Sequence, residues 1–371
     1  MSSRVLISIV TYNSARYLQS CLDSISDQTF RDFSISLWDN ASTDGTGEII
    51  ARNGKLFGFS HISAENIGFC AAHNRLISSA DSDYILVLNP DVVLDRSFIE
   101  TLVTSMDDDR SAGSATGKLW RSGNQTATKK ILDSTGIYFT PNQRHFDRGS
   151  GEPDRGQYDT PEYVFGASGA AAFYRRAMLL DIGEGDSFFD EHFFAYREDA
   201  DLAWRAQWLG WRCLYVPQAM AYHVRRVLPE RRRALPDIIN MHSFKNRFLM
   251  RLKNMDMGTY ARYFIPITLR DLAILGYVLL FERSSMRAIP LIFRAFPDAW
   301  AVRKSIRGRK RISGREMRAW FSNRPIAKKK EPAPEVNRVE GQPGHSTRGQ
   351  AEGGDAAWES RRQQSSPRCR S

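Results

Sequence analysis

The stretch Tyr84-Ile85-Leu86-Val87-Leu88-Asn89-Pro90-Asp91-Val92-Val93-Leu94-Asp95 is the most informative part of this chain for its fold. It begins with five apolar residues, which is typical of a buried parallel strand. Pro90 has no N–H group and ends that strand, which leaves Asn89 and Asp91 at its carboxyl end. Ligands of open α/β sheets bind at this edge, and these oxygen donors suit a hard divalent cation that carries a diphosphate. The alternative for the tripeptide alone is an ordinary turn.

Three more strands with polar ends precede this stretch. Residues 5–10 lead into Thr11-Tyr12-Asn13, residues 33–38 into Asp39-Asn40-Ala41-Ser42, and residues 57–62 into Glu65-Asn66-Ile67-Gly68-Phe69. Four strand–helix units in fewer than 100 residues predict right-handed crossovers and a mostly parallel sheet. The polar ends should then meet at one sheet edge. This is the layout of a nucleotide site, although a Walker loop and a G-x-G-x-x-G motif are both absent.

The next part of the chain adds acidic residues and a histidine. Residues 123–161 are polar and predict a long, lid-like loop. Residues 164–174 (VFGASGAAAFY) carry small side chains, which allow a ligand or a second backbone to approach closely. An aromatic run then leads into a helix start with three carboxylates, Glu198, Asp199 and Asp201, where helix-dipole capping is the alternative explanation. His223 follows the next strand, and a lone histidine is more often structural than a ligand.

Composition limits the class of protein and its partners. The chain has 371 residues and a formal net charge of +10, concentrated after Arg225. A basic chain favours anionic partners such as a nucleotide, a nucleic acid or an acidic membrane face. The four cysteines, Cys21, Cys70, Cys213 and Cys369, form no C-x-x-C pair, which predicts reduced thiols in a cytosolic protein. The first residues lack the features of a signal peptide.

The last third of the chain changes character. Residues 242–255 predict a basic amphipathic helix. Residues 272–281 (LAILGYVLLF) are wholly apolar, but ten residues are too few to span a bilayer, which needs about 20. This segment is either part of a buried helix pair or lies in the plane of an anionic cytoplasmic membrane face. Beyond Pro325 the chain lacks apolar periodicity and predicts disorder.

In this order, the motifs of the first 225 residues resemble the family 2 glycosyltransferases with the GT-A fold, in particular their rhamnosyltransferase-like branch. The resemblance rests on an ordered set of motifs: Thr11-Tyr12-Asn13, Asp39-Asn40-Ala41-Ser42, Glu65-Asn66-Ile67-Gly68-Phe69, Asn89-Pro90-Asp91, Phe189-Asp190-Glu191, Glu198-Asp199-Ala200-Asp201-Leu202 and His223. It implies an α/β fold with a single Rossmann-like, mostly parallel sheet flanked by helices, and a helical C-terminal extension. We expect a GT-A domain over residues 1–225, a basic, amphipathic helical extension over 226–325 and a disordered tail over 326–371.

The resemblance also implies an activity and a site. The activity is inverting transfer of a sugar from a nucleotide-diphosphate donor, with dTDP-rhamnose favoured, to a hydroxyl of a glycan or lipid-linked glycan in cell-surface polysaccharide assembly. Asp199 would be the catalytic base, with Glu198 and Asp201 as alternative candidates that contact the acceptor or support the site. Asp91 and His223 would bind Mg²⁺ or Mn²⁺. The donor-binding residues would be Thr11, Tyr12, Asn13, Asp39, Asn40, Asn66, Gly68, Asn74 and Asn89. The enzyme would be cytoplasmic and would meet the cytoplasmic face of the membrane as a peripheral protein.

One departure from the family pattern concerns the metal. Asn89 replaces the first aspartate of the family's D-x-D motif, and one fewer negative charge weakens cation binding in the absence of the donor. Two other functions stay open. An inactive sugar-nucleotide-binding relative would not need Asp91 and Asp199, which are both present. A nucleic-acid-binding protein would carry aromatic-interleaved RNA motifs or zinc spacing, and this chain has neither, so no nucleic acid is expected as a partner.

Overall fold

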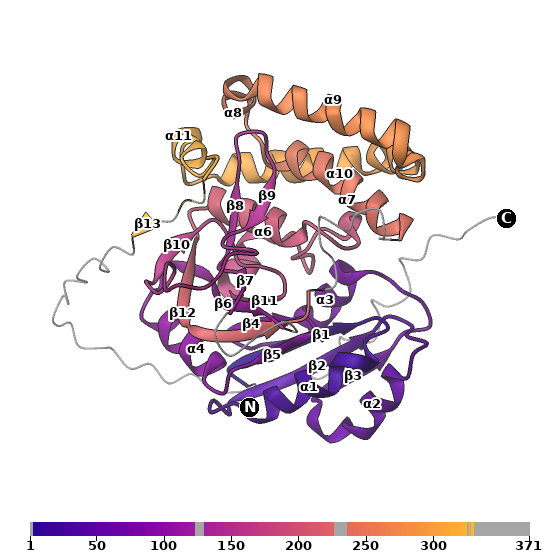
Figure 1. Ribbon diagram of the computed structural model, residues 1–371, viewed down its shortest axis with the longest axis vertical. Helices are drawn as coiled ribbons and strands as arrows, with labels where there is room; N and C mark the ends of the chain where they lie inside the picture. Colours follow the sequence, from indigo (N-terminus) through magenta and orange to yellow (C-terminus); the bar gives the residue numbers. More distant parts are fainter. Residues whose placement is uncertain (1–2, 123–129, 226–235, 325, 327, 330–371) are drawn as a thin grey trace, which may run out of the picture. The chain divides into compact units, whose positions relative to one another are not determined.

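The computed structural model describes residues 3–122, 130–225, 236–324, 326 and 328–329. Residues 1–331 form one compact unit around a large sheet, whose strands follow the order β13-β10-β12-β6-β11-β4-β1-β2-β3 (Figure 1). Two further strands join this sheet, β5 beside β12 and β7 beside β6. The strands are β1 (Val5–Thr11), β2 (Phe33–Asp39), β3 (Phe59–Ile62), β4 (Tyr84–Leu88), β5 (Val92–Leu94), β6 (Ala112–Arg121), β7 (Leu132–Ser134), β10 (Glu162–Val164), β11 (Ala171–Arg175), β12 (Arg212–His223) and β13 (Lys328–Lys329). A separate hairpin consists of β8 (Ile137–Phe139) and β9 (His145–Asp147).

The first four long strands form the parallel part of the sheet. β1 runs parallel to both β2 and β4, and β2 runs parallel to β3. Their side chains are almost all buried in β1 and β4, as the continuous apolar runs predict. The other half is mixed, because β11 lies antiparallel between β4 and β6, whereas β12 runs parallel to β6. The predicted Rossmann-like, mostly parallel sheet with flanking helices is confirmed, with this mixed half added.

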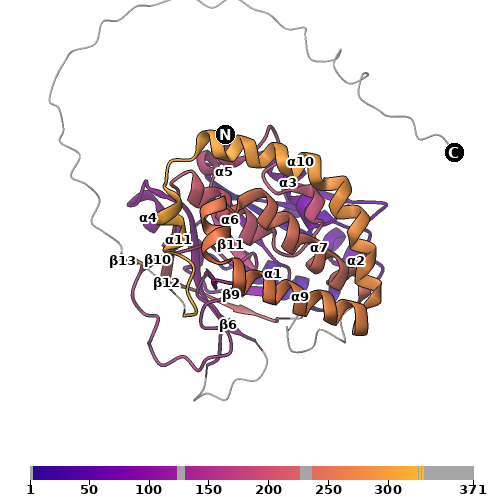
Figure 2. The same ribbon diagram turned by 90° about the horizontal axis from the view of Figure 1, so that it is seen from above.

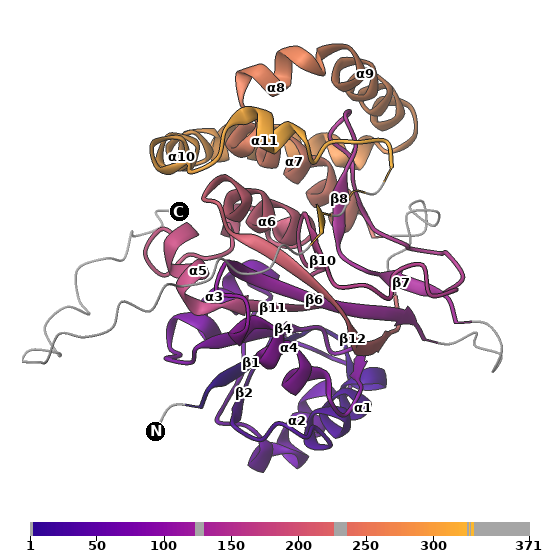
Figure 3. The ribbon, with the colours of Figure 1, turned by 90° about the vertical axis from the view of Figure 1, so that its left-hand side faces the viewer.

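Helices cover both faces of the sheet. α1, α2 and α4 lie on one face, and α3, α5 and α6 lie on the other (Figure 3). The helices are α1 (Ala15–Ser26), α2 (Thr46–Arg52), α3 (Phe69–Ser78), α4 (Phe98–Asp107), α5 (Arg176–Ile182), α6 (Glu198–Trp208), α7 (Asp237–Asn254), α8 (Met257–Arg262), α9 (Phe264–Phe281), α10 (Ala288–Arg309) and α11 (Gly314–Arg318). An aromatic cluster holds α6 in place, since Trp204 packs against Phe139, Phe165 and Phe321, with ring centroids 5.1 to 6.3 Å away.

The polar stretch after β6 is more ordered than its sequence predicts. Residues 123–129 lie outside the described part of the chain, but residues 130–161 contain β7, β8 and β9 instead of one long loop. The prediction of a loop was wrong here because scattered apolar residues, Leu132, Ile137 and Phe139, are fully buried against the sheet and α6. The polar composition of this stretch therefore did not indicate that it contains three strands.

The C-terminal helices α7–α11 gather at one end of the unit, with α9 outermost (Figures 1 and 3). Helix α7 lies between α9 and α10 when the molecule is seen from above (Figure 2), and Phe244 of α7 packs with Val278 of α9 and Ala288 of α10. Of the tail expected over residues 326–371, almost all lies outside the described residues. The exceptions include Lys328 and Lys329, which form β13 beside β10.

Candidate active site

The end of β4 turns at Asn89-Pro90-Asp91, as its sequence predicts. Val92 N–H donates to the carbonyl of Asn89 at 3.2 Å and closes the turn. The chain then enters β5, which pairs with the end of β12 so that Val92 lies opposite His223. Val224 N–H donates to the carbonyl of Asp91 at 2.9 Å. Strand pairing thus brings Asp91 and His223, which are far apart in the sequence, to the same place at the sheet edge.

The side chains of Asp91 and His223, the two predicted metal ligands, are in contact. Asp91 Oδ1 is buried, accepts no hydrogen bond from the described residues, and lies 3.4 Å from His223 Nε2. The other ring nitrogen, Nδ1, is 2.7 Å from Asp133 Oδ2. Such a carboxylate partner fixes the ring orientation of metal-binding histidines. Burial alone would lower the pKa of His223, but the neighbouring carboxylates of Asp133 and Asp91 raise it to about 9.

Two protein ligands fit a cation that also binds the donor diphosphate. Among the described residues, no group of three or more His, Cys, Asp or Glu side chains is arranged to hold a metal. Mg²⁺ commonly uses one or two carboxylates, substrate phosphates and water, so a complete protein cage is not required. The orphaned carboxylate oxygen of Asp91 beside the oriented imidazole of His223 is consistent with this kind of site.

Asp133 continues the site toward a second pair of charges, and sequence reasoning missed it. Its Oδ1 accepts a hydrogen bond from Arg225 Nη1 at 3.1 Å, and Arg225 Nη2 donates to Asp147 Oδ2 at 2.5 Å. Burial raises the pKa of Asp133, but the neighbouring His223 and Arg225 together lower it below its ordinary value. Asp133 and Asp147 lie in the polar stretch that predicted only a loop. The available signal for Asp133 was its position among residues that favour a strand.

Asp199 lies in the first turn of α6 and is tied to the end of β4 by one short segment. Its Oδ2 accepts a hydrogen bond from Gly169 N–H at 3.0 Å, and the next residue, Ala170, accepts one from Asn89 N–H at 2.9 Å. A Cβ atom at position 169 would lie 3.3 Å from Asp199 Oδ2, which explains a glycine at this close approach. The Asp199 carboxylate and the Asn89-Pro90-Asp91 turn therefore bind adjacent backbone positions.

The turn before α6 is strained. Phe194, Tyr196 and Arg197 have φ angles of 66°, 71° and 74°, in the left-handed region that non-glycine residues rarely adopt. Asn246 of α7 compensates for this strain, because its Nδ2 lies 2.8 to 2.9 Å from the carbonyls of Phe193, Ala195 and Tyr196. Asn246 is fully buried. Sequence analysis predicted only an amphipathic helix here, and a polar residue on its buried face was the available signal.

The carboxylates at the start of α6 have different environments. Burial and the charge of Asp199 raise the pKa of Glu198 to about 8, and Glu198 Oε2 accepts no hydrogen bond from the described residues. Burial also raises the pKa of Asp199, but the N–H of Gly169 opposes this. Burial thus acts on both carboxyl groups, and at Asp199 the N–H groups of Gly169 and Ala200 oppose the rise in pKa. Asp201 is fully buried and accepts hydrogen bonds from Arg205, Lys253 and Asn254.

The polar ends of β1 and β2 form a connected group next to this centre. Thr11 Oγ1 donates to Asp39 Oδ1 at 2.5 Å, and Thr43 N–H donates to Asn13 Oδ1 at 2.9 Å. Asn40 N–H donates to the carbonyl of Thr11 at 2.8 Å. Tyr12, between them, has half of its side chain exposed. The predicted donor residues at these two strand ends are thus brought together.

The Asn66–Gly68 loop reaches the turn that precedes Asp199. Asn40 Nδ2 lies 3.3 Å from the carbonyl of Gly68, and Asn66 Oδ1 accepts a hydrogen bond from Gly68 N–H at 2.9 Å. Gly68 has a φ of +88°, and a Cβ atom there would lie 2.6 Å from the ring of Phe194. Only glycine permits this contact. The third predicted strand end therefore converges on the same region as the other three.

The side chain of Asn74 makes its hydrogen bonds to other residues of the protein. Its Oδ1 accepts hydrogen bonds from Phe188 N–H and Phe189 N–H, and its Nδ2 donates to the carbonyl of Phe189 at 2.8 Å and to Glu191 Oε1 at 3.1 Å. The side chain is buried. Its donor-binding role stays a prediction, and the contacts described here brace the segment that leads to Asp190.

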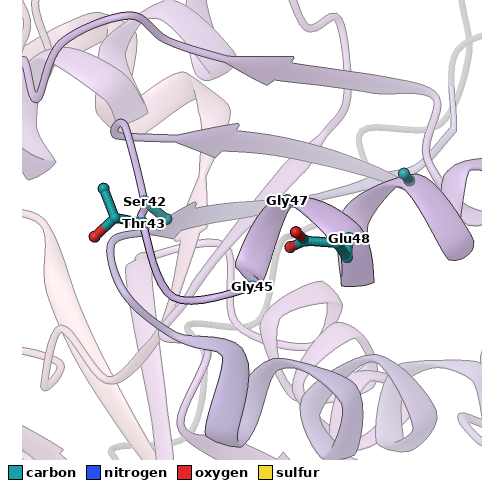
Figure 4. A pocket seen from close by; sticks show the side chains of 6 residues that line it. Ser42, Thr43, Gly45, Gly47 and Glu48 are labelled. Carbon is teal, nitrogen blue, oxygen red and sulfur yellow. The ribbon is translucent and has the colours of Figure 1, made fainter.

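A shallow hollow of about 400 Å³ borders the loop after β2 (Figure 4). Its lining residues are Ser42, Thr43, Gly45, Gly47, Glu48 and Ala51. None of them is a predicted site residue. Because α2 has only seven residues and its N-cap Gly45 offers no side chain, this hollow supports no ligand assignment of its own.

Comparisons with known proteins identify a family and several relatives of this chain. Residues 6–183 match the family model described as glycosyl transferase family 2. The chain is 29% identical over 247 residues to N-acetylglucosaminyl-diphospho-decaprenol L-rhamnosyltransferase of Mycobacterium tuberculosis, a match that covers 58% of this chain and 74% of that protein. It is also 29% identical over 103 residues to glycosyltransferase GlyA of Streptococcus pneumoniae, where the match spans 28% of this chain and only 15% of GlyA.

Solved structures share the fold at low sequence identity. TarS 1–349 of S. aureus has a TM-score of 0.51 at 16% identity, with 83% of this chain and 88% of that chain covered. GalNAc-T7 with UDP, GalNAc and Mn²⁺ has a TM-score of 0.54 at 16% identity, with 68% of this chain and 49% of that chain covered. Together with the family match and the order of motifs along the sheet edge, these findings show that residues 6–183 match a family 2 glycosyltransferase domain and that the chain has the GT-A fold.

Proposed function

We propose that this protein transfers a sugar, with inversion, from a nucleotide-diphosphate donor to a hydroxyl of a glycan or lipid-linked glycan. The observation that carries the proposal is the Gly169-Ala170 segment, which binds the Asp199 carboxylate through one residue and the backbone of Asn89 through the next. A base and a diphosphate-binding turn attached to adjacent backbone positions are what a direct displacement at an anomeric carbon requires.

Asp199 is the proposed general base. It would accept the proton of the acceptor hydroxyl as that oxygen attacks the anomeric carbon and the bond to the diphosphate breaks. The hydrogen bonds that Asp199 accepts from the N–H groups of Gly169 and Ala200 favour the ionised form that this role requires. Asp201 would support the site, since Arg205, Lys253 and Asn254 already occupy its oxygens.

Asp91 and His223 are the proposed ligands of Mg²⁺ or Mn²⁺. The cation would neutralise charge on the leaving diphosphate. Asp133 would orient His223 through Nδ1, and Arg225 would hold Asp133 in place. Asn89 would add an amide oxygen at the same turn without adding a charge. On the opposite side, Thr11, Tyr12, Asn13, Asp39, Asn40, Asn66 and Gly68 would contact the nucleotide or the sugar.

The similarity to the mycobacterial rhamnosyltransferase favours rhamnose as the sugar, with dTDP-rhamnose as the donor. The same similarity favours a lipid-linked acceptor that carries N-acetylglucosamine on a diphosphate. Such an enzyme would act in the cytoplasm, at the cytoplasmic face of the membrane, during assembly of a cell-surface polysaccharide. An inactive sugar-nucleotide-binding relative is the alternative function.

A donor screen tests this proposal. Purified full-length protein with a divalent cation should release nucleoside diphosphate from one of a panel of nucleotide sugars, and an N-acetylglucosaminyl-diphospho-polyprenol acceptor should increase the release. Asp199→Asn should lower turnover about 10²–10⁴-fold, the usual contribution of a general base, and leave donor binding within a factor of a few. Donor binding without any release by the native protein would favour the inactive relative, and a near-normal rate in Asp199→Asn would exclude this residue as the base.

A further inference from the structure

Helix α9 presents an apolar surface that none of the described residues covers. Ile265, Leu269, Leu272, Leu280 and Phe281 are all more than 60% exposed, whereas Ile267 and Val278 on the opposite side are buried. Helix α10 adds Phe293, which is 74% exposed, nearby in the chain. Soluble proteins rarely expose so many large apolar side chains on one element, and such patches mark contact surfaces.

The charged residues around this surface indicate what kind of partner it contacts. Arg262, Arg283, Arg287 and Arg294 flank the apolar side chains and are exposed. The acidic residues of the same segment face inward, because Asp271 pairs with Arg251 at 2.7 Å and Glu282 is buried and accepts a hydrogen bond from Ser285. Exposed leucine and phenylalanine side chains with arginines at both ends match a lipid surface that contains anionic headgroups.

Other occupants fit less well. By length and composition α9 is long and apolar enough to cross a membrane, the one such helix among the described residues. A crossing would, however, pull Val278 away from Phe244 and Ala288, and would break the Arg251–Asp271 pair. A second copy of the chain would bring its arginines to the same interface. Residues 330–371 are polar and contain few large apolar residues, so they lack the side chains to cover this surface.

The β8–β9 hairpin connects this surface to the charged residues around His223. Arg270 Nη1 in α9 donates to the carbonyl of Asn142, at the tip of the β8–β9 hairpin, at 3.0 Å. The hairpin rises from the sheet toward α9 (Figures 1 and 3). At its other end, Asp147 of β9 binds Arg225, which also binds Asp133 beside His223.

We propose that α9 lies in the plane of an anionic membrane surface and that this contact holds the acceptor side of the site at the bilayer. The apolar side chains of α9 enter the headgroup boundary, and the flanking arginines bind lipid phosphates. This inference rests on the proposed function for the nature of the acceptor, because a lipid-linked glycan would be presented at that surface. The membrane contact itself does not depend on catalysis.

Vesicle flotation of the full chain tests the contact. The native protein should float with vesicles of equal parts phosphatidylglycerol and phosphatidylcholine, and less with phosphatidylcholine alone. The double variant Ile265→Glu/Leu280→Glu should partition at least about tenfold less. The matched control, Phe59→Glu/Leu180→Glu, replaces two side chains that are about half exposed on β3 and α5, and should float like the native protein. Thermal unfolding checks that both variants are folded.

Several outcomes would overturn the inference. It fails if the native protein does not float with anionic vesicles, if the α9 variant floats as well as the control, or if the native chain is a dimer that the α9 variant dissociates. Donor-dependent nucleotide release in the absence of vesicles separates this failure from that of the proposed function. Retained release with lost flotation in the α9 variant would support the membrane contact, and absence of release in every protein would count against the enzyme activity alone.

Discussion

At the scale of single residues, the site depends on which carboxyl groups keep their charge. Glu198 and Asp199 are neighbours in one helical turn, yet Glu198 Oε2 is buried without a hydrogen bond to the described residues, and Asp199 accepts two from backbone N–H groups. Asp199 also lies beside the segment that holds the β4 turn. The sequence presented three acidic candidates, and only their hydrogen-bond partners distinguish them.

The raised pKa of Glu198 predicts a specific pH dependence of stability. Because its pKa is about 8 in the fold and lower in the unfolded chain, the folded state binds the extra proton, and stability should decline as the pH rises toward 8. Glu198→Gln mimics the protonated form, so its melting temperature should fall less than that of the native protein between pH 5.5 and pH 8. Calorimetry at both pH values measures this. Equal declines in the two proteins would contradict the assignment.

Asp133 should act through His223 and not through the substrate. Asp133→Asn keeps the size of the side chain but weakens the hydrogen bond that orients the imidazole, so Mn²⁺ affinity in the presence of nucleoside diphosphate should fall about 10–100-fold. Titration calorimetry measures that affinity. The exposed residue Asp81 offers a control, since Asp81→Asn should leave it unchanged. Unchanged Mn²⁺ affinity in Asp133→Asn would show that His223 is not a ligand.

At the scale of elements, α7 belongs functionally with the catalytic domain. Asn246 holds three carbonyls of the strained turn before Asp199, and Lys253 contacts both Asp190 and Asp201. An enzyme shortened to the first 225 residues would lose these contacts. The helix therefore holds the turn before the proposed base, in addition to any role of the C-terminal helices at a membrane.

Asn246→Leu should separate this positioning role from ordinary stability. Unpaired buried carbonyls should cost about 2–5 kcal/mol of unfolding free energy, and the relaxed turn should lower kcat at least about tenfold with a smaller change in the KM for the donor. Asn53→Leu is the control, because Asn53 makes side-chain hydrogen bonds far from the site, to Gln19 and Ile49. If both variants lose stability but keep the native kcat, Asn246 is only structural.

The sequence predicted the parts of the site that local patterns encode. Each parallel strand ends in polar residues, so Thr11, Asp39 and Asn89 were identified as belonging to one edge before any contact was known. Asp133, Asp147 and Asn246 were not identified. Asp133 and Asp147 lie in a stretch whose polar composition resembles a loop, and Asn246 lies on a helix whose periodicity indicates only amphipathicity. The partners of all three are distant in sequence, and a one-dimensional pattern does not encode such pairings.

Helix α9 was also predicted only in part, because the sequence predicted a shorter apolar segment than the structure shows. Its apolar run predicted ten residues, but the helix starts at Phe264 and has 18. The charged residues Arg270 and Asp271 conceal the continuation in the sequence. In the fold their charges are directed to Asn142 and Arg251, so the helix continues through them. Exposure of the apolar face, which distinguishes a surface helix from a buried pair, follows only from the packing.

At the scale of the whole molecule, the proposed reaction needs one pocket between the two halves of the sheet. The parallel half would supply the proposed nucleotide contacts, the β5–β12 pairing supplies Asp91 and His223, and α6 supplies Asp199. Asp91 connects to Asp147 through His223, Asp133 and Arg225, and to Asp199 through Asn89 and the Gly169-Ala170 segment. These two routes connect the proposed metal ligands with the proposed base.

Anomalous diffraction from crystals of the protein with Mn²⁺ and a nucleoside diphosphate tests this arrangement most directly. We predict one manganese peak within coordination distance of Asp91 and His223 Nε2, with the diphosphate bound to it and the Asp199 carboxylate facing the open side of the terminal phosphate. A manganese ion bound elsewhere, or a diphosphate separated from Asp199 by the sheet, would contradict the account.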